Sequence, residues 1–308
     1  MAKSNVRTAS VVRTRLILAV AAILLLTAGT ILAFQTIAAS PQRTPGDQIL
    51  VDAEWLEQRL GEVVILDSAR SLDAFLEGHI PGAALVAREV TWETIDGIEG
   101  MLPDPELVAQ DLADAGVSLD TPVVVYDAGN GLWASRLFWA LEYLGHRQVH
   151  LLDGGFAAWQ AAGFDTAVTP AFPERGDFVA NPQPELIADR DYILDKLDSG
   201  ALTVLDTRSP DEFTGADVRA ERGGHIPGSI NIEWTENVGQ GRSYRPLEDL
   251  SGLYQDTLAA GDTVTLCQTG VRGAHTYVAL RVLGQQQVRV YDGSWAEWGN
   301  DPDAPIDL

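Results

Sequence analysis

The sequence predicts an α/β protein with two tandem copies of one domain, each a central parallel sheet with helices on both faces. Short, continuously apolar segments alternate with helix-like segments, which is typical of parallel strands joined by helical crossovers. Three motifs of the first half recur in the same order in the second half, about 140 to 146 residues later. One hydrophobic helix is expected before the first copy.

The repeated motifs define the duplication. They pair residues 67–70 (DSAR) with 206–209 (DTRS), residues 79–83 (HIPGA) with 225–229 (HIPGS), and residues 152–159 (LDGGFAAW) with 291–298 (YDGSWAEW). Three matches in one order are improbable by chance, so we interpret residues 47–168 and 185–308 as two copies of a single domain.

The elements of each copy follow from apolar patterning and helix stops. The first copy is expected to have strands at 63–66, 123–126 and 149–152, and helices at 72–77, 105–115 and 133–144. The second copy is expected to have strands at 203–205, 264–266 and 288–291, and a helix at 274–283. Four prolines between residues 170 and 184 indicate a linker at 169–184.

The N-terminus predicts a membrane or signal segment. Residues 1–15 are basic and contain no acid, and the apolar run 16–34 that follows spans roughly 28 Å as a helix. An uncleaved anchor, a cleaved signal peptide and a buried soluble helix all fit this pattern. In the first two cases the basic flank stays in the cytoplasm, so the protein is membrane-anchored or secreted, with its domains on the extracytoplasmic side. Residues 39–46, with two prolines, are expected to form a tether.

The composition narrows the possible partners. The formal net charge of −23 argues against nucleic acid, because phosphate would be repelled. A positively charged niche in so acidic a protein would mark an anion site. The five histidines show no ligand spacing, so neither a metal nor another cofactor is expected.

The only cysteine, Cys267, is the strongest candidate for chemistry. It ends the apolar strand-like run 263–266 and opens the loop 268–273 ahead of a helix. Backbone N–H groups and the positive end of a helix dipole converge at such a junction, and both favour the nucleophilic thiolate. Arg272 adds a fixed positive charge for an anionic substrate. The alternative is a buried, inert cysteine.

These motifs resemble those of the tandem-domain rhodanese family, the thiosulfate and 3-mercaptopyruvate sulfurtransferases. The resemblance covers about residues 48 to 300 and rests on the turns 78–82 and 224–228 (GHIPG), the Cys267 loop and the closing run 291–295 (YDGSW). It implies that the Cys267 thiolate takes the sulfane sulfur of a donor such as thiosulfate. A thiol or cyanide would then remove that sulfur from the persulfide.

The same resemblance suggests substrate-binding residues. Arg272 is expected to hold the anionic end of the donor, together with the loop residues Gln268, Thr269, Gly270 and Val271. A positive φ at Gly270 would let the loop curl around the sulfur.

Two residues outside the loop are further candidates. Arg208 resembles the family's second substrate-binding arginine by its position, with a surface ion pair to Asp206 or Asp211 as the alternative. Trp295 could wall the pocket or serve as a core aromatic residue.

The first copy carries Asp127 where the second carries Cys267. A carboxylate cannot carry a sulfur atom, so the first copy is expected to be non-catalytic, as the resemblance also implies. Asp127 would act near the interface or cap its own loop.

Several alternatives stay open. The loop favours thiosulfate as the donor, with 3-mercaptopyruvate as the alternative. A phosphatase loop needs Cys and Arg six positions apart. Cys267 and Arg272 are five apart, so the loop is one residue too short for that chemistry. A membrane-tethered persulfide relay or binding module with little turnover of its own is the non-enzymatic alternative. A monomer is expected, because two joined copies already supply a pseudo-dimer.

Overall fold

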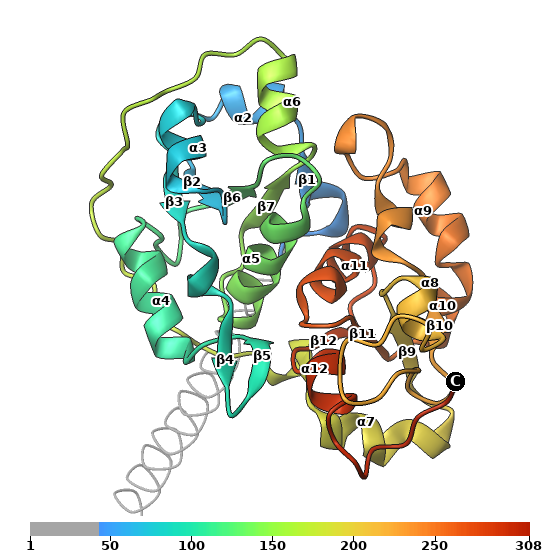
Figure 1. The fold of residues 1–308 in the computed structure, drawn as a ribbon. Coiled ribbons are helices and arrows are strands. Elements are labelled where there is room, and N and C mark those ends of the chain that lie inside the picture. The colour runs from blue at the N-terminus through green and yellow to red at the C-terminus, as the bar shows by residue number, and fades with distance from the viewer. Residues whose placement is uncertain (1–42) are drawn as a thin grey trace, which may run out of the picture. The chain divides into compact units, whose positions relative to one another are not determined.

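Two five-stranded parallel sheets form the framework of residues 43–308, the part of the chain that this computed structural model describes (Figure 1). The first sheet has the strands β1 (Leu50–Val51), β2 (Val64–Ser68), β3 (Ala84–Val86), β6 (Val123–Tyr126) and β7 (Val149–Leu152). The second has β8 (Ile187–Ala188), β9 (Thr203–Asp206), β10 (Ile230–Asn231), β11 (Thr263–Leu266) and β12 (Val288–Tyr291).

The two sheets have the same topology. The order is β1-β7-β6-β2-β3 in the first and β8-β12-β11-β9-β10 in the second, and all neighbours are parallel. The predicted α/β fold with duplicated parallel sheets is therefore confirmed. We call the unit around the first sheet the first domain and the unit around the other sheet the second domain.

Helices cover both faces of each sheet. Those of the first domain are α2 (Ala53–Glu57), α3 (Leu72–Glu77), α4 (Pro105–Asp114), α5 (Leu132–Tyr143) and α6 (Gly155–Ala161). Those of the second are α7 (Arg190–Lys196), α8 (Pro210–Phe213), α9 (Leu247–Leu253), α10 (Gln255–Ala260), α11 (Val271–Val282) and α12 (Ser294–Trp298). In β6, Val123 and Val125 face the core of α4 and α5, whereas Val124 faces that of α2, α3 and α6. This alternation buries both faces, as a parallel sheet requires.

The helix after the cysteine begins earlier than the sequence suggests. We expected it to start at Ala274, but α11 starts at Val271, with Gly270 as its left-handed N-cap (φ 75°). Gly273 is accommodated inside the helix because its Cα faces the backbone of β11, where a Cβ would lie 3.3 Å from the Leu266 Cα. Arg272 therefore lies in the first helical turn.

The two domains share one core through α5 and α11, which pack against each other. At the far end of this helix pair, Arg281 donates to the Glu142 carboxylate at 2.8 Å, and both side chains are fully buried. Such a pair is costly to break from one side, because the remaining charge stays buried without a partner.

The tether expected up to residue 46 ends earlier. The Thr44 N–H donates to the Arg147 carbonyl at 2.8 Å, and Arg281 donates to the Thr44 carbonyl at 3.2 Å. The chain is thus fixed to the folded unit from Arg43 onwards. The hydrophobic segment 16–34 lies outside the described residues. Within residues 43–308, no helix has the length and apolarity needed to cross a bilayer.

A short antiparallel hairpin of the first domain was not expected from the sequence. It consists of β4 (Glu93–Ile95) and β5 (Ile98–Met101), joined by Asp96 and Gly97 at φ 53° and 85°. Two consecutive positive φ values are those of a type I′ turn, which Asp-Gly favours. The hairpin projects from the first domain towards α12 (Figure 1).

Candidate active site

Cys267 lies in a tight turn between the carboxyl end of β11 and the start of α11, an edge where parallel sheets bind ligands. The residue is 1% exposed, and its Sγ accepts a hydrogen bond from the Thr269 N–H at 3.4 Å. Within residues 43–308, no acceptor binds the N–H groups of Val271, Arg272 and Gly273. These helix-start donors are therefore available to an anion.

The side chain of Ser294 stabilises the turn through hydrogen bonds to its backbone. Its Oγ accepts hydrogen bonds from the N–H groups of Cys267 (3.2 Å) and Gly270 (3.1 Å) and donates to the Tyr291 carbonyl (2.7 Å). Ser294 has φ 50°, which is unusual for a residue other than glycine, and it is fully buried. The equivalent residue of the first domain is Gly155, so this hydroxyl exists only beside the cysteine.

Arg272 projects from the first turn of α11 and forms a two-pronged ion pair with Glu212. Nη1 donates to Oε2 at 2.6 Å and Nη2 to Oε1 at 2.9 Å. Burial opposes the charge of Arg272, but the bond to Glu212 and the electrostatic interaction with Cys267 raise the pKa of Arg272 above its usual value. The guanidinium is thus a permanent positive charge within electrostatic reach of the sulfur.

Glu212 is itself fixed at the N-terminus of α8. It forms a capping box with Ser209. Its Oε1 also accepts a hydrogen bond from Nη1 of a second arginine, Arg219, at 3.2 Å. Burial alone would raise the pKa of Glu212, but the hydrogen bonds and the charge of Arg272 lower it to about 2. At the equivalent third position of α3, the first domain has Ala74.

Glu212→Gln is expected to lose stability at neutral pH. A carboxyl whose pKa is lowered in the folded state stabilises above its unfolded pKa, near 4.5, and the stabilisation is lost as the pH falls through about 2. Urea denaturation at pH 7, 4 and 2.5 should therefore show a gap from the wild type that narrows with acid. Glu236→Gln, which removes an exposed partner of Arg245, is the control. A gap that does not depend on pH would contradict this assignment.

The corresponding turn of the first domain is filled by its own carboxylate. Asp127 Oδ1 accepts the N–H groups of Gly129 (2.8 Å) and Gly131 (3.1 Å). Oδ2 accepts those of Trp133 (3.0 Å) and Ala134 (3.3 Å). Asp127 therefore caps its own loop, which is the second of the two roles expected for it.

This carboxylate shows what the other turn lacks. Trp133 and Ala134 are the second and third residues of α5, and Arg272 and Gly273 hold the same places in α11. The equivalent N–H groups thus bind an internal anion in one domain and are unoccupied in the other. The second turn therefore leaves these N–H groups available to an anion from outside the loop.

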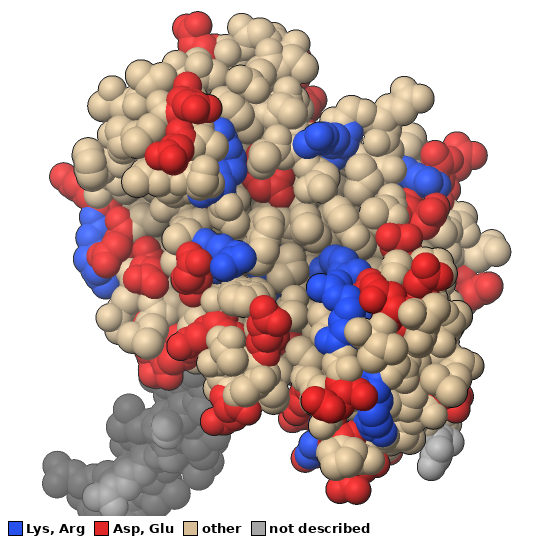
Figure 2. Space-filling model, in the orientation of Figure 1, with Lys and Arg blue, Asp and Glu red and all other residues tan. Residues whose placement is uncertain are grey.

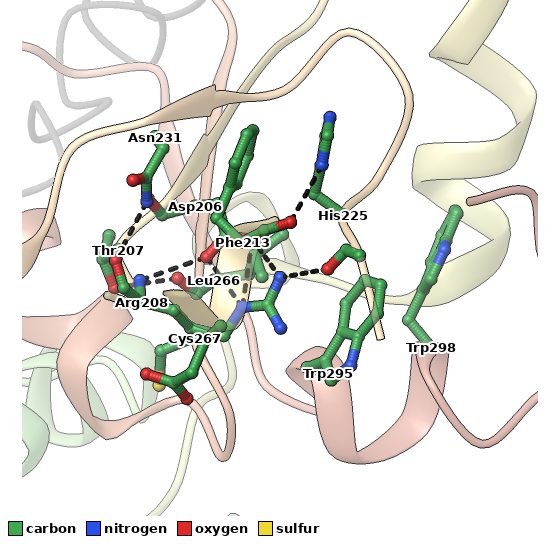
Figure 3. A network of polar contacts seen from close by, with 12 residues as sticks. Asp206, Thr207, Arg208, Phe213, His225, Asn231, Leu266, Cys267, Trp295 and Trp298 are labelled. Carbon is green, nitrogen blue, oxygen red and sulfur yellow. Dashed lines mark hydrogen bonds and ion pairs between the residues drawn. The ribbon is translucent and has the colours of Figure 1, made fainter. Parts of the chain in front are cut away.

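Arg208 is engaged in a buried network (Figure 3). Its guanidinium donates to the Asp206 carboxylate at 2.6 Å and to the Gly224 carbonyl at 2.8 Å, and lies 4.1 Å above the Trp295 ring. Only 1% of Arg208 is exposed. Its expected alternative, an ion pair with Asp206, is what the structure contains, although the pair is buried.

The first domain repeats this network without any cysteine. Arg70 donates to Asp67 at 2.8 Å and to the Gly78 carbonyl at 3.0 Å, and lies 4.3 Å above the Phe156 ring. An arrangement present in both domains joins the strand to the GHIPG turn in each. The same comparison places Trp295 in the core, where it is 1% exposed and donates to the Arg222 carbonyl at 3.1 Å.

The remaining loop residues lie around the sulfur on different sides. Gln268 is nearly buried and donates to the Arg219 carbonyl at 3.0 Å, and Val271 is buried at the start of α11. Thr269 faces the hairpin of the first domain, where a Cβ on Gly100 would collide with it. The turn is therefore bordered by both domains.

The chain as a whole is acidic, with a formal net charge of −23. Figure 2 shows acidic side chains spread over the visible face, with patches of lysine and arginine between them. Arg272, the half-exposed Arg219 and the buried Arg136 supply three positive charges near the turn, against the carboxylates of Glu212 and Asp292. The local positive balance suits an anionic ligand within an otherwise acidic protein.

Comparison with known proteins decides the family. The rhodanese-like domain family matches residues 52–162 and 189–301, one match in each of the two domains. This chain is a tandem-domain rhodanese. The rhodanese is 35% identical to the thiosulfate sulfurtransferase of Azotobacter vinelandii over 84% of this chain and 97% of that protein.

Other relatives of this rhodanese include both types of sulfurtransferase. It is 37% identical to the thiosulfate sulfurtransferase of Corynebacterium glutamicum, covering 84% of this chain and 90% of the relative. It is 34% identical to the probable 3-mercaptopyruvate sulfurtransferase of Pseudomonas aeruginosa, covering 83% and 97%. The structure of the 3-mercaptopyruvate sulfotransferase SseA of Escherichia coli matches with a TM-score of 0.72 and 30% identity over 81% of this chain and 100% of that one.

Some residues of this rhodanese site were missed in the sequence. Three residues were not among the predicted site residues. Ser294 binds the backbone of the turn, Glu212 binds Arg272, and Gly100 is where the hairpin contacts Thr269. A position-by-position comparison of the two copies would have found two of them. Serine replaces Gly155 and glutamate replaces Ala74 only in the copy that has the cysteine.

Proposed function

We propose that this rhodanese transfers a sulfane sulfur from thiosulfate to a thiol or to cyanide through a persulfide on Cys267. The observation that carries the proposal is the turn itself: the sole cysteine lies among unoccupied helix-start N–H groups and beside a guanidinium. The first domain, with Asp127 in place of the cysteine, is proposed to be non-catalytic. The names of the curated relatives support the same activity.

The reaction needs two displacements at sulfur. The Cys267 thiolate attacks the outer sulfur of thiosulfate, the new S–S bond forms, and sulfite leaves with the electron pair of the broken bond. An acceptor thiolate or cyanide then attacks the outer sulfur of the persulfide and releases the Cys267 thiolate. Arg272 and the N–H groups of Val271 and Gly273 are proposed to stabilise the negative charge in both steps. Gln268, Thr269 and Gly270 shape the turn.

The test is the intact mass of residues 43–308 after incubation with thiosulfate. A gain of one sulfur, about 32 Da, that cyanide removes is the expected result. Because Cys267 is the only cysteine, protein alkylated beforehand is a complete control. No gain with thiosulfate but a gain with 3-mercaptopyruvate would select the alternative donor. No gain with either would favour the persulfide relay or binding module.

Arg208 offers a separate test of its expected role in substrate binding. Its match to Arg70 supports a structural role, so Arg208→Met and Arg70→Met are expected to lower the melting temperature to a similar extent. The KM for thiosulfate of the folded Arg208→Met protein should stay within about twofold of the wild type. A selective rise of KM in Arg208→Met would restore it as a substrate-binding residue.

The basic residues 1–15 and the apolar run 16–34 support a further part of the proposal. The catalytic domains are proposed to lie on the extracytoplasmic side of a membrane, anchored or secreted, as a monomer. Fractionation of cells expressing the full chain, with protease added to intact cells or spheroplasts, tests this. A full-length protein in the soluble cytoplasmic fraction would contradict it.

A further inference from the structure

A buried arginine of the first domain, Arg136, reaches the cysteine turn of the second domain. Its Nη1 donates to Asp292 Oδ1 at 2.6 Å, its Nη2 to the Gly100 carbonyl at 2.9 Å, and its Nε to the Thr91 carbonyl at 3.0 Å. The side chain is fully buried. One planar guanidinium thus joins three segments, of which one belongs to the second domain.

Two of these segments support the cysteine turn. Asp292 also accepts the Leu102 N–H at 2.7 Å, and it precedes by two residues Ser294, whose hydroxyl holds the turn. Gly100 packs directly on Thr269. Arg136 also lies close to the turn itself, since a Cβ on Gly270 would be 3.0 Å from Nη1.

The other side of the interface lacks such an arginine. Arg136 is the fifth residue of α5, and the fifth residue of α11 is His275. The His275 Nε2 lies 3.1 Å from the Asn130 carbonyl in the turn of the first domain. Burial lowers the pKa of His275 to about 3, so it is neutral there. Of the two turns, only the one that carries the cysteine has a charged, three-pronged support from the described residues.

We propose that Arg136 is a positioning residue for sulfur transfer, through which the domain without a cysteine fixes the Cys267 turn. The inference rests on the persulfide chemistry proposed above. Arg136 holds Gly100 against Thr269 and holds Asp292 in register with Ser294. The N–H groups of the turn then keep their orientation while charge moves onto and off the sulfur. Small errors in such geometry are costly, on the order of a hundredfold in rate for about 1 Å.

The chain contains a matched control for this proposal. Arg281 is equally buried and also pairs across the interface, with Glu142, but it lies at the other end of the same two helices. Arg136→Met and Arg281→Met should both lower the melting temperature. Only Arg136→Met should slow single-turnover persulfide formation in the folded protein, by roughly 10- to 100-fold. Arg136→Lys, which keeps the charge but not the planar fork, should recover stability more than rate.

A second readout does not depend on the donor. The rate at which iodoacetamide alkylates Cys267 is measured against pH in the same variants. Arg136→Met should shift the midpoint of this profile, and Arg281→Met should leave it unchanged. Equal rates and equal profiles in the two methionine variants would overturn the proposal. If the wild type gains no sulfur, the proposed function fails, while the alkylation profiles still test the role of Arg136.

Discussion

Arg272→Met is expected to slow persulfide formation from thiosulfate roughly 100- to 1,000-fold. Methionine keeps much of the side-chain volume but removes the only guanidinium in the first turn of α11. The anionic donor and the departing sulfite then lose a permanent positive charge at a buried site, where charge is poorly screened by solvent. Stopped-flow or quenched-flow measurement of the first turnover gives the rate directly.

Arg219→Met is the matched control for this substitution. Arg219 pairs with the same carboxylate, Glu212, but its side chain is 51% exposed. Its removal should change the rate by less than about tenfold, with an effect that fades at high salt. Equal losses in the two variants would show that general electrostatic attraction, not the placement of Arg272, governs the step.

Asp127→Ala is expected to destabilise the protein by about 3 kcal/mol or more. The substitution leaves four N–H groups in the first domain without their acceptor, three of them buried and that of Trp133 partly buried. Each buried group costs about 1 to 3 kcal/mol when no water replaces the partner. Chemical denaturation measures the loss. Formate, a small carboxylate that can accept the same hydrogen bonds, should restore part of the stability at millimolar concentrations.

Asp153→Ala tests whether the effect is specific to the filled turn. The Asp153 carboxylate accepts the Tyr244 N–H at 2.8 Å at the domain interface. Its loss should cost less, about 1 to 2 kcal/mol, and should not respond to formate. A similar loss in both variants, or no response of Asp127→Ala to formate, would contradict the view of Asp127 as an internal anion.

The sequence predicts the three inner strands of each sheet, but neither the edge strands nor the turns. The central strands β6, β7 and β12 lie where their apolar runs placed them, because both faces of a parallel sheet are buried. The start of α11 was placed three residues late, after Gly273 instead of after Gly270. The choice between them depends on the close approach of Gly273 to β11, which is a tertiary contact. The hairpin carries a readable signal, Asp96-Gly97, but no apolar run.

Side-chain partners at the site were harder to predict than the nucleophile. Cys267 and Arg272 lie in one short loop, so their proximity follows from the local chain. Arg272 and Glu212 are 60 residues apart, and Arg136 and Asp292 are 156 apart. No periodicity or propensity links such residues, because the fold alone brings them together. Arg208 was predicted to bind the substrate because of the family resemblance. The structure shows that it makes the same contacts as Arg70 of the first domain, which has no cysteine.

The support that Arg136 gives across the interface has a consequence for how such a chain could arise. The contact of Leu102 with Asp292 is mirrored by that of Tyr244 with Asp153, and α5 mirrors α11. A one-domain ancestor with these surfaces would assemble as a two-fold dimer. Such a dimer would have two identical sites, each supported by residues of the other subunit. Once the two copies are fused in one chain, their sequences can diverge, and the two sites need no longer be identical. The first domain can then lose its cysteine and still be retained, because selection on the second domain preserves α5, the helix that carries Arg136.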